Sequence, residues 1–261
     1  MNKGEDMDRK EYWNENYVKY WKDKVEEANL NGKIYINKGD IKTTSDSLIF
    51  DLCNSLEFED NSKILDFGCG FCRLYENFKH KSVQYYGIDI SSAMVEESIR
   101  NYPELKDRLL VSEGEKLPFE NETFDIIVCF GVFDACYQEK ALKEILRVLK
   151  VGGKVILTGK NYKYFSEDEK ALVAEKNARA KGHPNYFTDV HSMISQIIEQ
   201  GIVIRDQFYF PRRGDFQDMK YYKEIQDQFY EYLLILEKQK SINKDFNKFS
   251  YEYSNTFREL K

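Results

Sequence analysis

Short apolar runs alternate with amphipathic helical patterns through the middle of the chain. The runs at 63–67, 85–90, 109–111, 124–130 and 155–158 predict strands, and the three-to-four-residue spacing of apolar positions at 75–78, 92–101 and 140–149 predicts helices. The run at 124–130 is almost entirely apolar, which is typical of a strand buried on both faces. Alternating strands and helices of this length predict an α/β fold with a doubly wound, mostly parallel sheet.

Helical patterns also precede and follow this core. One face of a helix at 8–28 carries aromatic and apolar side chains: Trp13, Tyr17, Tyr20, Trp21 and Val25. A second helix is expected at about 46–56, and helices at 166–182, 188–200 and 216–240 with a strand at 202–210 follow the core. We therefore expect an N-terminal helical cap at 1–45 and one domain at 46–261, with inserted helices at about 166–182 and 216–240.

Composition and charge narrow the function classes. Hydrophobic residues make up 42% of the chain and charged residues 32%, as in globular proteins. The balance of 39 basic and 45 acidic residues leaves a net charge of −6 without a basic cluster, so nothing indicates a nucleic-acid partner. No apolar run approaches the roughly 20 residues that cross a bilayer, and the N-terminus has no secretory pattern. We expect a cytoplasmic protein without a membrane segment, and the five cysteines do not indicate a disulfide framework.

A glycine-rich loop follows the first strand of the core. Asp66 stands at the strand end, and Gly68 and Gly70 follow at the turn into a helix. Ligands of open α/β sheets bind at the carboxyl ends of strands. A dinucleotide fingerprint would need glycine where Arg73 stands, and Asp66 would repel a pyrophosphate. A positively charged ligand group would instead be attracted.

Two further carboxylates follow the next two strands. Asp89 ends the second strand, where an acidic side chain can accept the hydroxyls of a ribose. Glu113 follows the third strand, where a carboxylate can accept from the exocyclic amine of an adenine. The three acidic residues together predict an adenosyl ligand with a cationic amino-acid tail.

Four motifs extend this interpretation to a family. They read ILDFGCGFCRL, YYGIDISSAMVEES, VSEGEKLPFENETFDIIVCFGVFDA and ALKEILRVLKVGGKVILTG, in that order, within residues 63–159. With them the chain resembles class I S-adenosylmethionine-dependent methyltransferases of the small-molecule type. The resemblance implies a seven-stranded Rossmann-like sheet with an antiparallel last strand, expected at 249–257, and S-adenosylmethionine as the cofactor.

The resemblance also implies roles for individual residues. It places Asp66, Gly68 and Gly70 beside the methionine part of the cofactor, Asp89 at the ribose and Ile90 on the adenine, Glu113 and Gly114 at the adenine edge, and Phe130 near the methyl group. Tyr12 and Tyr17 are candidates to cover the cofactor, with packing in the core as the alternative. Cys72 departs from the family, which often has a third glycine there.

The implied activity is methyl transfer from S-adenosylmethionine to an oxygen or nitrogen of a small-molecule acceptor, for which we consider a sugar or a natural-product intermediate. His183 and Asp134 are the first candidates for a general base, although His183 would also suit a surface loop. Further candidates are Tyr137, which like Asp134 follows the fourth strand, and Lys160 and Asn161, which follow the fifth.

Other functions remain open at this point. A non-catalytic S-adenosylmethionine-binding sensor or partner subunit is the alternative from another class, and a nucleotide-dependent oxidoreductase is a third. DNA is not expected as a partner, because the fourth strand is followed by Gly131-Val132-Phe133 rather than a Pro-Pro-aromatic signature. No metal site is expected, since Cys69 and Cys72 lack further ligands at matched spacing. A homodimer through the aromatic face of 216–240 is a further candidate.

Overall fold

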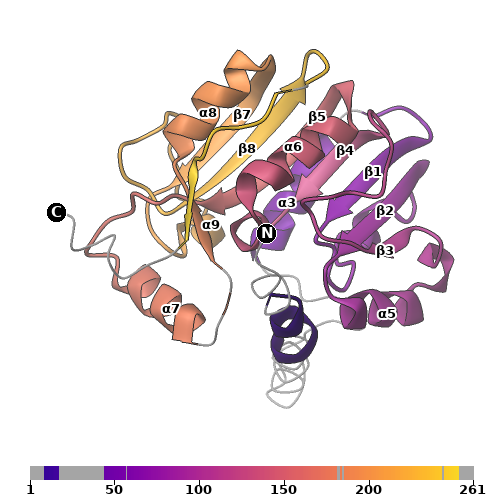
Figure 1. Cartoon of the computed structure of the whole chain (residues 1–261), viewed down its shortest axis with the longest axis horizontal. Coiled ribbons are helices and arrows are strands. Elements are labelled where there is room, and N and C mark those ends of the chain that lie inside the picture. The colour runs from indigo at the N-terminus through magenta and orange to yellow at the C-terminus, as the bar shows by residue number, and fades with distance from the viewer. Residues whose placement is uncertain are drawn as a thin grey trace. The chain divides into compact units, whose positions relative to one another are not determined.

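The computed structural model describes residues 9–17, 44–56, 58–180, 183, 185–242 and 244–252 (Figure 1). The chain divides into two compact units, residues 1–113 and 114–261. The cap boundary expected at residue 45 adjoins residues 18–43, which lie outside the described residues, and it stays a prediction. Among the described residues, no helix combines the length and the apolar character needed to span a membrane.

The first unit contains a three-stranded parallel sheet in the order β3-β2-β1. In chain order its elements are η1 (Tyr12–Tyr17, a π-helix), α3 (Thr44–Ser55), β1 (Ser62–Phe67), α4 (Tyr75–Phe78), β2 (Val83–Asp89), α5 (Ser92–Asn101), η2 (Pro103–Leu105) and β3 (Leu109–Val111). The expected helix at 8–28 is described only up to residue 17, so Tyr20, Trp21 and Val25 lie outside the described residues.

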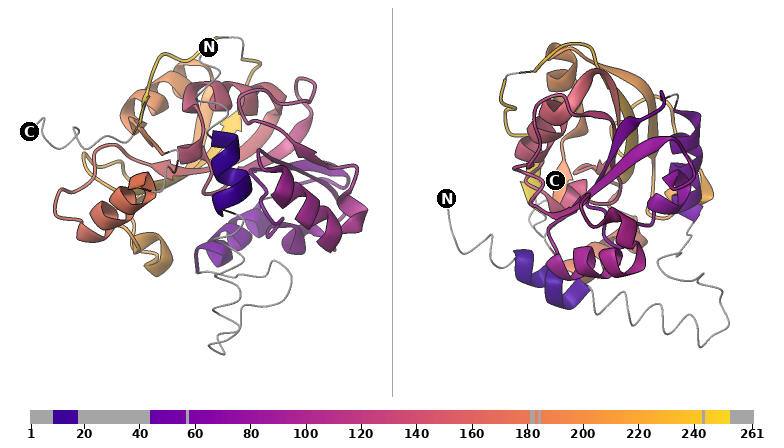
Figure 2. Two further views of the ribbon diagram at one scale, coloured as in Figure 1. Left: turned by 60° about the horizontal axis from the view of Figure 1, so that its bottom comes forward. Right: turned by 90° about the vertical axis from the view of Figure 1, so that its right-hand side faces the viewer.

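The second unit contains four strands in the order β4-β5-β8-β7. In chain order its elements are β4 (Phe124–Cys129), η3 (Phe133–Ala135), α6 (Gln138–Val148), β5 (Leu149–Lys160), α7 (Glu169–Ala180), β6 (Tyr186–Thr188), α8 (Val190–Glu199), β7 (Ile202–Phe210), α9 (Asp215–Asp218), β8 (Glu231–Lys238) and β9 (Ser250–Glu252). β4 and β5 are parallel, and β8 lies between β5 and β7, antiparallel to both (Figure 2). β6 and β9 form a separate two-stranded sheet.

The predicted fold class is confirmed. The seven strands give a doubly wound, mostly parallel, Rossmann-like architecture, and its antiparallel strand, β8, is the last of the seven in chain order. The helix expected within 166–182 is present as α7.

Two predictions about the C-terminal third are wrong. The long helix expected at 216–240 is a four-residue helix, α9, followed by a loop and the central strand β8. Tyr232 to Leu236 is an unbroken apolar run, and a fully buried strand with such a run has no periodicity that separates it from a helix. The strand expected at 249–257 is described only as β9, which pairs with β6 instead of serving as the antiparallel strand of the main sheet. Residues 253–261 lie outside the described part.

A buried lysine joins β8 to α6. Lys238 is 1% exposed, and its Nζ donates to the carbonyl oxygens of Leu146 at 2.9 Å and Leu149 at 2.6 Å, with Glu122 Oε1 at 3.2 Å. Carbonyls at the end of a helix have no donor within the helix, and a cation is favoured there by the helix dipole. Lys238 therefore satisfies polar groups that would otherwise be buried without a partner.

Candidate functional site

The loop after β1 turns through three residues in the left-handed region. The φ angles are 75° at Gly68, 51° at Gly70 and 55° at Cys72. Glycine adopts such angles readily, whereas a side chain costs about 1–2 kcal/mol. Cys72 is fully buried and keeps the backbone conformation that a glycine would have. The missing third glycine therefore leaves the turn in place.

Strand β2 and helix α5 hold this loop. The backbone amides of Gly68 and Cys69 both donate to the carbonyl of Ile88 at 2.8 Å. The Gly70 carbonyl accepts from the Ser98 hydroxyl at 2.8 Å. A methyl group added at Gly70 would lie 3.7 Å from the sulfur of Met94, in ordinary contact, so the left-handed φ is the main reason for glycine here. The loop is thus pre-formed by contacts from its own unit.

Asp89 closes the same loop from the end of β2. One carboxylate oxygen accepts from the Gly70 amide at 2.9 Å, and the other accepts from the Ser91 amide at 2.9 Å, where α5 begins. Burial raises the pKa of Asp89, and these backbone amides oppose the rise. A carboxylate has about four lone-pair sites, so Asp89 can hold two amides and still accept the hydroxyls of a ribose.

Asp66 lies buried at the end of β1. Its carboxylate accepts a hydrogen bond from the hydroxyl of Tyr85, which is also buried. Burial raises the pKa of Asp66 to about 7, and the bond from Tyr85 partly opposes this rise. A cationic ligand group beside Asp66 would favour its ionised form.

The N-terminal helix contacts this end of the first unit. Lys10 forms an ion pair with Glu113, and Asn14 Oδ1 accepts from the Ser91 hydroxyl at 3.0 Å. Tyr12 is buried within this helix, whereas the side chain of Tyr17 lies outside the described part of the structure. Glu113 is therefore already paired with a cation, a contact that the sequence did not indicate.

The other predicted cofactor residues are partly exposed. Ile90 follows Asp89, and Gly114 begins the second unit. Phe130 follows β4, and its ring stacks on that of Phe216 in α9, with centroids 6.1 Å apart and planes 20° apart. The position predicted for Phe130 near a methyl group stays a prediction.

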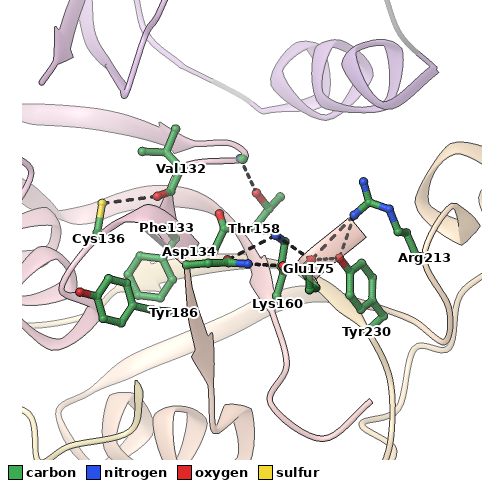
Figure 3. Close-up of polar contacts among 12 residues, drawn as sticks. Val132, Phe133, Asp134, Cys136, Thr158, Lys160, Glu175, Tyr186, Arg213 and Tyr230 are labelled. Atoms are coloured by element: carbon green, nitrogen blue, oxygen red, sulfur yellow. Dashed lines mark hydrogen bonds and ion pairs between the residues drawn. The ribbon is translucent and has the colours of Figure 1, made fainter. Parts of the chain in front are cut away.

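A cluster of charged side chains lies at one end of the second unit (Figure 3). Lys160 ends β5, and its Nζ lies 2.9 Å from Asp134 Oδ2 and 3.0 Å from Glu175 Oε1. Asp134 belongs to η3, just after β4, and the carboxyl ends of parallel strands share one edge of a sheet. Two residues considered from the sequence, Asp134 and Lys160, are thus brought together.

Glu175 is the centre of this charged cluster. It lies on α7 with a side-chain exposure of 1% and accepts hydrogen bonds from the Tyr230 hydroxyl and the Asn185 amide. Arg213 donates to the Tyr230 hydroxyl at 2.8 Å and lies 3.9 Å from Glu175. The charged cluster of Asp134, Lys160, Glu175, Asn185, Arg213 and Tyr230 therefore ties α7 to the strand ends.

The charges of this cluster perturb one another. Burial would raise the pKa of Asp134, but the adjacent ammonium of Lys160 outweighs it and the pKa is lowered. Burial would lower the pKa of Lys160, but Asp134, Tyr230 and Glu175 hold it well above its usual range. Burial lowers the pKa of His183, although the negative charge of Asp134 opposes this. His183 is therefore mainly neutral near pH 7.

Sequence reasoning missed Glu175 and Tyr230. Glu175 lies one helical turn after Ala171, which is fully buried, so helical spacing places both on the inward face of α7. That spacing was the available signal for Glu175. Tyr230 fell inside the segment wrongly predicted as a helix.

Cys69 and Cys72 are buried free thiols. The hydrogen bond with Cys72 and burial raise the pKa of the Cys69 thiol well above its usual range, so this thiol is not reactive. Among the described residues, no group of three or more His, Cys, Asp or Glu side chains is arranged to hold a metal ion.

Part of the chain matches a known protein family. Residues 65–157 match the family model of a methyltransferase domain. This segment contains the loop of Gly68 and Gly70 with Asp89. This segment is similar to the methyltransferase domain of class I S-adenosylmethionine-dependent enzymes, and S-adenosylmethionine is the cofactor of that class.

The chain is also similar to individual curated proteins. The chain is 34% identical over 117 residues to an uncharacterised protein of Methanocaldococcus jannaschii. The alignment covers 43% of this chain and 49% of that protein. It is 33% identical over 108 residues to the ubiquinone/menaquinone biosynthesis C-methyltransferase of Laribacter hongkongensis. That alignment covers 36% of this chain and 41% of the relative. The match thus spans half or less of the length of these curated relatives.

A solved structure shows the same fold. It is the geranyl diphosphate C-methyltransferase of Streptomyces coelicolor A3(2), crystallised with Mg²⁺, geranyl-S-thiolodiphosphate and S-adenosyl-L-homocysteine. The TM-score is 0.56 at 13% identity, covering 74% of this chain and 76% of that enzyme. At this identity the likeness is one of fold.

Proposed function

We propose that this protein transfers the methyl group of S-adenosylmethionine to an oxygen or nitrogen of a small-molecule acceptor. The observation that carries the proposal is the left-handed glycine loop, which Asp89 holds closed beside the buried Asp66. A carboxylate here suits a ligand whose amino-acid end is cationic. The segment that matches the methyltransferase family contains all of these residues.

Each predicted cofactor residue then has a defined task. In the first unit, Asp66, Gly68 and Gly70 are proposed for the methionine part, Asp89 for the ribose hydroxyls, Ile90 and Glu113 for the adenine, and Tyr12 and Tyr17 as a cover. The roles of Gly114 at the adenine edge and of Phe130 near the methyl group remain those that the family resemblance implies. The bound cofactor supplies an electrophilic methyl group. The protein mainly has to align the acceptor and exclude water.

His183 and Asp134 are proposed for the acceptor side. His183 is partly exposed and mainly neutral near pH 7, so it can accept a proton from an attacking hydroxyl or amine. Asp134 favours the protonated form of His183 through its negative charge and also holds Lys160. A base of this kind suits an acceptor that loses a proton when it is methylated, as a hydroxyl oxygen or an amine nitrogen does.

Two alternatives are separated by experiment. The ubiquinone/menaquinone relative is named a C-methyltransferase, so the first alternative is that this chain methylates a carbon atom of its acceptor. A cofactor-binding sensor or partner subunit would bind S-adenosylmethionine without transferring its methyl group.

Calorimetric titration with S-adenosylmethionine tests the cofactor site. Asp89→Asn should weaken binding at least tenfold, because the neutral side chain holds the Gly70 amide and the ribose less well. Asp107→Asn, an exposed acid of the same unit, is the control and should bind like the wild type. Unchanged affinity in Asp89→Asn would refute the assignment.

A metabolite extract incubated with radiolabelled methyl donor tests the transfer. We expect a labelled small molecule with a new O-methyl or N-methyl group, and weaker labelling with His183→Ala. A new C-methyl group would contradict the proposed acceptor atom. Tight cofactor binding without any labelled product would support the sensor.

A further inference from the structure

A third carboxylate, Glu231, lies beside the charged cluster of the second unit. Glu231 begins β8, and the register of the antiparallel pair places it directly opposite Lys160 of β5. Residues directly opposite each other in an antiparallel pair project from the same face of the sheet. Glu231 and Lys160 therefore share the face on which Lys160 meets Asp134 and Glu175.

The cations of the cluster are already engaged by other groups. Lys160 has three N–H donors, and these meet Asp134 at 2.9 Å, Glu175 at 3.0 Å and the Asn185 carbonyl at 3.4 Å. Arg213 donates to Tyr230. Among the described side chains, none donates a hydrogen bond to the carboxylate of Glu231.

The charges leave one carboxylate in excess. Asp134, Glu175 and Glu231 face two fixed cations, Lys160 and Arg213. Glu231 retains some solvent exposure, whereas the Glu175 side chain is 1% exposed and accepts hydrogen bonds from Tyr230 and Asn185. The group that this site lacks is a cation that also donates hydrogen bonds.

We propose that Glu231 binds the ammonium group of the methyl acceptor, so that the substrate class is a small amine. This inference rests on the proposed function, and it makes Glu231 a specificity-determining residue. The methylated atom is either the amine itself or another nucleophile of the same molecule.

The surroundings of Glu231 support a cationic ligand. Burial raises its pKa to about 7, although Lys160 and Arg213 lower it, and Asp134 and Glu175 raise it further. A cation bound at this position would favour the ionised carboxylate and offset that cost.

An aromatic group flanks the same side of the unit. Tyr164 is partly exposed, stacks on Phe187 with centroids 5.7 Å apart, and meets Tyr230 edge-on at 5.6 Å. Lys160 Nζ lies 6.0 Å from the centroid of the Phe187 ring. These rings next to the charged cluster suit an amine carried on a flat or ring-shaped framework.

Three probes with one framework and different charges test the inference: benzylamine, benzyl alcohol and benzoate. Each is titrated at pH 8 into the full-length protein by calorimetry or ligand-observed NMR. We expect wild-type protein to bind benzylamine at least tenfold more tightly than benzyl alcohol, with benzoate weakest. Glu231→Gln should reduce the preference for benzylamine to less than threefold. Glu224→Gln, the same change at an exposed glutamate of this unit, should retain it.

Several results would overturn the inference. Tighter binding of benzoate would mean that Arg213 and Lys160 select an anion, and no preference among the probes, or no binding of benzylamine, would show that Glu231 recognises no amine. If Glu231→Gln does not fold, the wild-type preference decides. S-adenosylmethionine is titrated in parallel. Cofactor binding without an amine preference removes only this inference, whereas an amine preference without cofactor binding removes the proposed function.

Discussion

Replacing Glu175 by alanine tests whether the charged cluster secures α7 to the strand ends. The Glu175 carboxylate is 1% exposed and contacts Lys160, Tyr230 and Asn185 (Figure 3). Alanine leaves Lys160 with Asp134 as its remaining acidic partner and removes the acceptor of both Tyr230 and Asn185.

The expected loss of stability follows from burial. Removing one partner of a buried ion pair costs about 3–5 kcal/mol, because the other charge stays buried. Glu175→Gln keeps an oxygen that can accept from Tyr230 but loses the charge that faces Lys160. We expect about 1–3 kcal/mol for glutamine, in the range for a buried group left partly unsatisfied, and about 3–5 kcal/mol for alanine.

Urea denaturation followed by far-ultraviolet circular dichroism measures both losses, and hydrogen exchange of α7 reports where they act. Glu169→Ala is the matched control, since Glu169 lies exposed on the same helix. It should cost less than 1 kcal/mol. An equally small loss for Glu175→Ala would refute the reasoning, because the cost of burying the carboxylate would then cancel its ion pairs.

Three further predictions each concern the substitution of one residue. In Gly87→Ala the added methyl group would lie 2.8 Å from Leu109 Cδ2, 2.9 Å from the sulfur of Cys69 and 3.0 Å from its Cβ, so it would press on the glycine loop as well as on Leu109. We expect at least a tenfold loss of S-adenosylmethionine affinity by calorimetry, and full affinity would contradict this. The Asp66 carboxyl, with a pKa of about 7, is mostly neutral at pH 6 and charged at pH 8. Affinity for the cationic cofactor should therefore rise with pH over this range, and Asp66→Asn should flatten the rise; a rise that persists in the variant would have another origin. Lys238→Met leaves two buried carbonyls without their donor. Each should lower the free energy of unfolding, measured by urea denaturation, by about 1–3 kcal/mol. Lys240→Met, at an exposed lysine, is the control and should lower the free energy of unfolding by less than 1 kcal/mol. Equal losses in the Lys238 and Lys240 variants would contradict a special role for the buried lysine.

Much of the fold was predictable because its signals are local. β3 and α5 have the bounds expected from the sequence, and β1, β2 and β4 differ by only one or two residues at an end. Short apolar runs between turn residues mark buried parallel strands, and the glycines after β1 mark a turn that needs left-handed backbone. Cys72 shows the limit of this signal, because a cysteine occupies the same backbone conformation.

The strand β8 was not predictable from its own residues. Tyr232 to Leu236 is buried on both faces, so the run has neither the two-residue period of a half-exposed strand nor a helical period. Its central position arises from pairing with β5 and β7, which precede it by many residues in the chain.

The sequence by itself determined the class of fold, the position of the glycine loop and the acidic residues around it, because each depends on neighbours in the chain. Only the tertiary structure decided that Glu175 pairs with Lys160 and that Glu231 lies opposite Lys160 in the sheet. Apolar periodicity specifies which face of an element is buried but carries no information on which distant charge will be its partner. The register between β5 and β8 and the packing of α7 supply that information.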